Sequence, residues 1–244
     1  MKIDPQEMQQ LAEAAAPRFD MYTVIHKAIR AQMADALLGL GRMDANDQAD
    51  LTRATQRVLD LLDMCTAHLQ HENEFVHPAL EARAPGSSAT IANEHVNHEW
   101  HIAHLTETTM TLLGAVPANR AQVAALLYRE LTLFLADNFQ HMHQEETAHN
   151  QILWANYTDT ELIGIHQTLV AAIAPDAMVR TLRWMVPAMA PTERTAMLAD
   201  MQAHAPRPAF EAVLDTVRPY LSDTEWDKLA RSLGWPVVPG LVTA

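Results

Sequence analysis

Apolar residues recur at steps of three and four along most of the chain, which is the spacing of one face of an α-helix. This pattern predicts four long helices, over residues 18–40, 48 to the high 70s, 88–113 and 119 to the mid 150s. A short polar-faced helix is expected before them, over residues 4–16. Alternating strand-like runs are missing, so the sequence predicts an all-α protein.

The second and fourth of these helices carry the same stripe of inward positions, displaced by 73 residues. Gly41, which is expected to end the first helix, maps onto Gly114 by the same offset. A helix pair repeated once is typical of a four-helix bundle. The two matching stripes are Ala54, Val58, Leu61, Cys65, His68, Glu72 and Phe75, and Leu127, Leu131, Phe134, Asn138, His141, Glu145 and Ala148.

After Thr158 the chain changes to shorter apolar stretches separated by prolines. They predict five helices, over residues 160–174, 177–189, 192–204, 208–220 and 223–234. We therefore expect a bundle domain over residues 18–157 and a helical C-terminal extension over residues 158–236. Because no histidine/carboxylate pair recurs on a stripe there, the extension is expected to serve packing, homodimerisation or the binding of a protein partner.

Composition narrows the classes of function and location. The formal net charge of −13 disfavours nucleic acid and anionic membranes as partners. No window reaches the ~20 apolar residues that a membrane span requires. A single cysteine and an N-terminus without an apolar signal core are typical of a cytoplasmic protein.

Two histidine–glutamate pairs interrupt the apolar stripes. His68 and Glu72 lie one helical turn apart on the second helix, and His141 and Glu145 do so on the fourth. A buried carboxylate is costly unless a partner compensates it. We therefore predict that these two pairs bind shared cations.

Histidines on the other two helices complete the predicted metal site. His26 lies on the stripe of the first helix, 42 residues before His68, and His95 lies on the third, 46 residues before His141. Each half of the repeat would then supply two imidazoles to one metal ion, with the glutamates bridging. His98 shares the stripe with His95 and is a further candidate ligand. Mixed imidazole and carboxylate ligands favour iron, manganese or zinc.

With these residues the chain resembles hemerythrin and the HHE cation-binding domains, over about residues 18–157. The resemblance implies an up-down four-helix bundle around a non-haem centre of two iron ions. It implies that His26 and His68 bind one iron, that His95 and His141 bind the other, and that Glu72 and Glu145 bridge them.

Two departures from the oxygen-carrying hemerythrins shape the expected function. Glu99 stands four residues after His95, where those proteins have a second histidine, and the fourth helix has Glu145 in an H-x3-E motif instead of H-x4-D. Both features resemble the iron-sensing and iron-centre-repair branches. The repeat offset carries His26 onto Glu99, so it does not choose between His95 and His98.

Three hypotheses follow from this site. In the first, the centre binds or handles oxygen, peroxide or nitric oxide. In the second, the chain senses iron or oxygen or repairs iron centres, and the C-terminal helices report the metal state to a partner. In the third, a structural helical protein binds zinc incidentally.

Tyr22, one turn before His26, is a candidate to point at the centre. Glu146 and several histidines off the stripes are expected to be solvated or to support the ligands: His71, His77, His101, His104, His143 and His149.

Overall fold

The computed structural model describes residues 18–237, so the helix expected over residues 4–16 lies outside the described residues. Within the described part every regular element is a helix, and no strand occurs there. The all-α prediction is therefore confirmed for this part of the chain.

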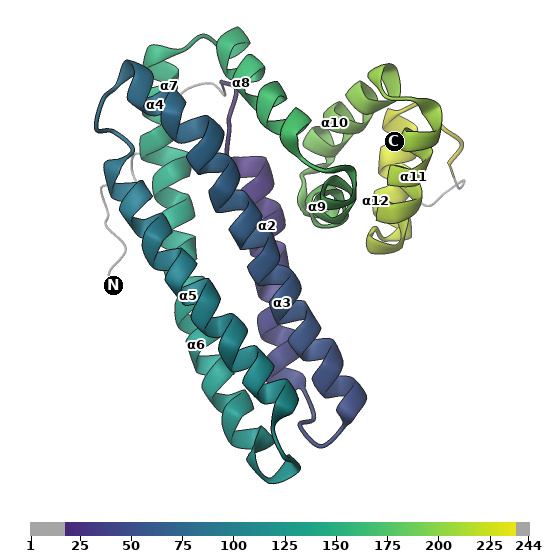
Figure 1. Ribbon diagram of the computed structural model, residues 1–244. Helices are drawn as coiled ribbons and strands as arrows, with labels where there is room; N and C mark the ends of the chain where they lie inside the picture. Colours follow the sequence, from purple (N-terminus) through teal and green to yellow (C-terminus); the bar gives the residue numbers. More distant parts are fainter. Residues whose placement is uncertain (1–17, 238–244) are drawn as a thin grey trace, which may run out of the picture.

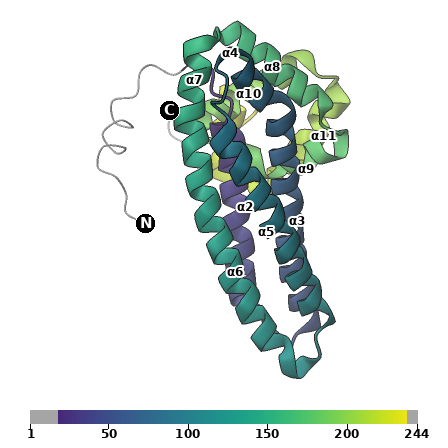
Figure 2. The ribbon, with the colours of Figure 1, turned by 60° about the vertical axis from the view of Figure 1, so that its left-hand side comes forward.

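Four long helices lie side by side and form the main body of the molecule (Figures 1 and 2). They are α2 (Thr23–Arg42), α3 (Gln48–His71), α5 (Ala89–Gly114) and α6 (Pro117–Gln144). Helix α2 packs on α3 and α6, and α5 packs on the same two helices from the other side. Their inward stripes meet in one apolar core, which includes Met33, Leu61, Leu105 and Leu131.

Local chemistry sets the ends of these helices. The Asp47 side chain accepts hydrogen bonds from the amides of Ala49 and Asp50, which caps α3. Gly41 was expected to end α2, but that helix continues to Arg42. The glycine instead allows a close approach, because a Cβ there would lie 2.9 Å from Cε2 of Tyr128 on α6.

Both glutamate-bearing helices change their winding at the glutamate. A π-helical turn follows α3 over Glu72–Val76, and another follows α6 over Glu145–His149. The chain then continues as α4 (His77–Arg83) and α7 (Asn150–Asn156). A π-turn inserts one residue into the register. The stripes were expected to continue through Phe75 and Ala148, whereas the next residues, Val76 and His149, are the buried ones.

The C-terminal extension contains the five predicted helices. They are α8 (Asp159–Ala172), α9 (Pro175–Ala188), α10 (Pro191–His204), α11 (Arg207–Val217) and α12 (Asp223–Ser232), with a 3₁₀ turn over Arg218–Tyr220. Prolines begin α9 and α10, and capping boxes begin α8 and α12.

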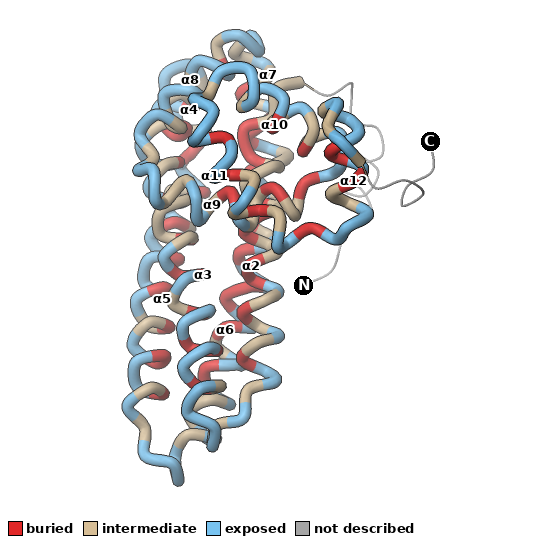
Figure 3. The backbone as a smooth tube through the Cα atoms, turned by 90° about the vertical axis from the view of Figure 1, so that its right-hand side faces the viewer, coloured by how far each residue is buried: buried red, intermediate tan, exposed pale blue. Residues whose placement is uncertain are grey.

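Helices α9–α12 enclose a second apolar core, and α9 packs along the outer side of α2. Buried positions line the inner faces of the long helices and recur within this second group (Figure 3). No single helix in the described part is long and apolar enough to cross a membrane; only α8 and α9 taken together pass that test, and they are bent by 118°.

Candidate metal centre

One histidine from each long helix points into the middle of the main body. His26 on α2 faces His68 on α3, with 3.1 Å between their Nε2 atoms. His95 on α5 faces His141 on α6, also with 3.1 Å between the Nε2 atoms. The rings of His26, His95 and His141 are at most 3% exposed. The helices therefore hold two pairs of imidazoles, each pair with its nitrogens directed at one point.

The carboxylates of Glu72 and Glu145 lie between the two imidazole pairs. Oε1 of Glu72 is 3.2 Å from Nε2 of His68, and its Oε2 is 3.5 Å from Nε2 of His95. For Glu145, Oε2 is 3.4 Å from Nε2 of His26 and Oε1 is 3.3 Å from Nε2 of His141. Each carboxylate thus directs one oxygen at each pair.

The carboxylate oxygens of this cluster find no hydrogen-bond partner within the protein, as is expected of atoms that bind a metal ion. All four oxygens of Glu72 and Glu145 are buried and have no hydrogen-bond partner. Buried polar groups without partners are rare because losing water without compensation is costly. Nitrogens that face nitrogens, with unpaired carboxylate oxygens between them, form a ligand set for cations of the imidazole- and carboxylate-binding kind.

Polar residues fix the far side of three of the rings. Nδ1 of His26 is 2.9 Å from Oε1 of Glu146, which is itself held by Arg30 at 2.6 Å. Nδ1 of His95 is 2.8 Å from Oδ1 of Asn73, and Nδ1 of His141 is 2.9 Å from Oε2 of Glu94. Ligand histidines usually donate their second N–H in this way, which fixes the tautomer and the ring orientation.

Without a cation, protons compensate part of the charge. Burial and the charge of Glu145 raise the pKa of Glu72 to about 8. Burial opposes charge on His26 and His141, but their acidic neighbours outweigh it and raise the pKa of each to about 9. Burial, opposed by the charge of Glu145, still lowers the pKa of His68 well below its usual value. In the metal-free protein Glu72, His26 and His141 therefore hold protons at neutral pH, and a metal ion would displace them.

The structure brings six of the seven candidate residues into two overlapping groups whose ligand atoms lie within 4.8 Å of one another. The first group is His26, His68, Glu72 and Glu145, and the second is Glu72, His95, His141 and Glu145. Both glutamates belong to both groups.

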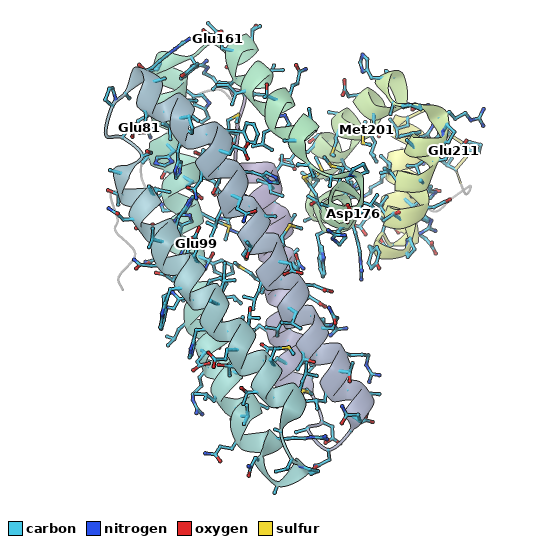
Figure 4. All side chains as sticks on the ribbon, in the orientation of Figure 1. Glu81, Glu99, Glu161, Asp176, Met201 and Glu211 are labelled. Carbon is cyan, nitrogen blue, oxygen red and sulfur yellow. The ribbon has the colours of Figure 1, made fainter. Side chains whose placement is uncertain are left out.

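His98 lies beside these groups and belongs to neither. Its Nε2 is 3.0 Å from Oδ2 of Asp137, and its ring packs against His141 with 4.6 Å between centroids. Its role as a ligand stays a prediction. Glu99, onto which the repeat offset carries His26, is exposed on α5 and is labelled in Figure 4.

Three further residues next to the centre are buried: His77, His149 and Tyr22. His77 and His149 were expected to be solvated or to support the ligands; they are 7% and 3% exposed, so they are not solvated. The π-turns that precede or contain them rotate them inward. Tyr22 is 1% exposed, its ring lies 5.6 Å from that of His26, and its hydroxyl is 3.2 Å from Nδ1 of His149.

The fold and the site together define a helical protein with histidine/carboxylate groups that could hold metal ions in its core. The model of the hemerythrin HHE cation binding domain matches residues 19–149, which is more than half of the chain. The chain therefore belongs to this family. Comparisons with curated proteins and with solved structures gave no match.

Proposed function

We propose that this chain is a non-haem di-iron protein that binds or handles oxygen, peroxide or nitric oxide. In this proposal α2, α3, α5 and α6 form the up-down four-helix bundle that the family implies, within a domain over residues 18–157. His26 and His68 would hold one iron and His95 and His141 the other. Glu72 and Glu145 would bridge them; manganese or zinc could take the same ligands.

The observation that carries the proposal is the position of the two glutamates. Each directs one carboxylate oxygen at each histidine pair, and none of the four oxygens has a partner. Two carboxylates with these contacts can each bridge two cations, whereas a single structural ion would leave one histidine pair unused. This arrangement favours a dinuclear centre over incidental binding of one zinc ion.

The residues around the centre suit it for a small ligand in a site with little water. Two iron ions would supply reversible electron changes to a diatomic or peroxide ligand. Leu69, which follows His68, and Phe134, whose ring lies 6.0 Å from that of His98, belong to the apolar core, and an apolar shell limits the access of solvent to such a site. Asn73, Glu94 and Glu146 orient the imidazoles and disperse their charge.

Metal analysis of freshly purified protein, with an absorption spectrum under air and under nitrogen, tests this proposal. We expect about two iron ions per chain and visible or near-ultraviolet bands that differ between the two atmospheres. His204→Gln, at a side chain that is 76% exposed, is a matched control and should retain both ions. A metal-free, colourless protein that gains no stability from added Fe²⁺ would contradict the proposal.

A second candidate function is sensing of iron or oxygen, or repair of iron centres, with the C-terminal helices reporting the metal state. It is favoured by one contact: Lys27, the residue after His26, forms an ion pair of 2.7 Å with Glu193 on α10. Because α9 also packs along α2, a shift of α2 on metal binding would move the helices of the extension.

Limited proteolysis with and without iron tests this second candidate. Cleavage within residues 158–236 should slow or quicken when iron is bound, and Glu193→Gln should reduce that difference. Asp176→Asn, at an exposed ion pair within α9, is the matched control. Equal cleavage of both forms of the wild-type protein would rule out this form of sensing.

A further inference from the structure

A third group of possible ligands lies next to the two that form the proposed centre. It consists of His77, Glu145 and His149, whose ligand atoms lie within 4.8 Å of one another. All three side chains are buried. The first residue of α4 and the last residue of the second π-turn supply the two imidazoles, which neither of the other groups contains.

The ring of His149 is held as the ring of a metal ligand usually is. It is hydrogen-bonded to the main chain of Ser87, in the loop between α4 and α5. Its Nδ1 is 3.2 Å from the hydroxyl of Tyr22. An imidazole that donates one N–H to a main-chain carbonyl can offer its other nitrogen to a metal ion, which here would take the place of the Tyr22 hydroxyl.

His77 has a polar atom that the described protein leaves unsatisfied. Its Nε2 is buried without a hydrogen-bond partner, as is Oγ of Ser87. The ring stacks on His95, with 4.8 Å between centroids, and meets the edge of His149 at 5.8 Å. The ring therefore cannot turn outward without losing these contacts, and its free nitrogen needs a partner in this place.

We propose that His77, His149 and Glu145 form a third metal site, which takes a divalent first-row cation such as Fe²⁺ or Zn²⁺. Two imidazoles and one carboxylate are a ligand set that non-haem iron and zinc accept. The site has three protein ligands and shares Glu145, so it binds its ion more weakly than the dinuclear centre does. In that respect this inference rests on the proposed function.

The third site borders the loop over residues 84–88 through the bond between His149 and Ser87, and Glu81 holds the same loop from the other side. That carboxylate, labelled on α4 in Figure 4, accepts hydrogen bonds from the amides of Gly86 and Ser88. Pro85 and Gly86 are exposed. An ion on the third site would thus lie between this loop and Glu145 of the proposed centre.

Equilibrium dialysis of metal-free protein against rising Fe²⁺ under nitrogen, followed by metal analysis, tests the inference. Wild type should bind two ions first and a third at higher free Fe²⁺. The double variant His77→Gln/His149→Gln should keep the first two and lose the third. The matched control His71→Gln/His204→Gln replaces two histidines outside all three groups and should bind three, with circular dichroism confirming that each variant folds.

The outcomes separate this inference from the proposed function. Two ions at every Fe²⁺ concentration would overturn the third site and leave the dinuclear centre standing, whereas no tightly bound ion would overturn both. A third ion that the double variant retains would also overturn the assignment to His77 and His149. If that variant does not fold, crystals of wild type soaked in Zn²⁺ decide: an anomalous peak between the two rings supports the site, and its absence refutes it.

Discussion

Glu72→Gln should stabilise the metal-free protein and weaken its binding of metal. The Glu72 side chain is 4% exposed, and neither of its oxygens has a hydrogen-bond partner. Burial and the nearby charge of Glu145 raise its pKa from 4.5 to about 8. An amide of the same shape carries no charge at any pH, so folding does not require it to take up a proton, but it cannot bridge two cations as an anion.

The size of the effect follows from the difference between the pKa of Glu72 in the unfolded chain, 4.5, and its pKa in the folded protein, about 8. Because the folded pKa is raised, the favourable contribution of the protonated group is complete below pH 4.5 and is lost as pH rises through about 8. At pH 7 the loss is roughly 3 kcal/mol, at about 1.4 kcal/mol per pH unit. Metal-free Glu72→Gln should therefore unfold roughly 6–12 °C above metal-free wild type.

Iron should reverse this order. Loss of a supporting residue typically lowers metal affinity by about 10–100-fold, so loss of a bridging ligand should lower it by at least about 100-fold. Thermal unfolding at pH 7, with and without Fe²⁺ under nitrogen, measures both effects, and Glu74→Gln at a nearby exposed position is the control. A lower melting temperature for the metal-free variant, or an unchanged affinity for iron, would refute the reasoning.

Further predictions concern pH, ring orientation and packing. Burial lowers the pKa of His26 and His141, but their acidic neighbours outweigh it and raise each pKa to about 9. Metal-free protein should therefore lose stability as pH rises from about 6.5 to 9. Urea unfolding across that range measures this, and a flat profile would contradict it. Glu94→Gln, which removes the carboxylate on Nδ1 of His141, should lower iron affinity by about 10–100-fold in dialysis, and an unchanged affinity would contradict that role. Leu131→Ala, at a fully buried position, should cost about 2–5 kcal/mol in urea unfolding, and a loss below about 1 kcal/mol would mean that the core is not packed as described.

Helical periodicity made most of the fold predictable. The stripes that contain Leu61 and Leu131 pack into the main core, and the prolines and capping boxes of the extension mark its helices to within a few residues. The same periodicity placed His68, Glu72, His141 and Glu145 on inward faces, where the structure has them. A repeat offset could be applied because α3 and α6, which carry the two glutamate motifs, each end at the residue before the glutamate and continue into a π-turn.

The parts that were not predictable depend on backbone winding and on tertiary neighbours. A π-turn has no signal in the spacing of apolar residues, so the inward position of His149 could not be foreseen. His95 and His98 are both buried on α5, about one turn apart. The choice between them depended on which is level with His141, and the apolar stripe does not give the position along the helix axis to better than one turn. Glu146 supports His26 because α6 lies beside α2, and that contact follows from the fold and not from local sequence.

The most direct measurement is anomalous diffraction at the iron edge from crystals of the protein purified under nitrogen. The account predicts two iron peaks, one between His26 and His68 and one between His95 and His141, with Glu72 and Glu145 bound to both. A single peak, or iron bound only at surface carboxylates, would contradict the dinuclear centre on which the proposed function depends.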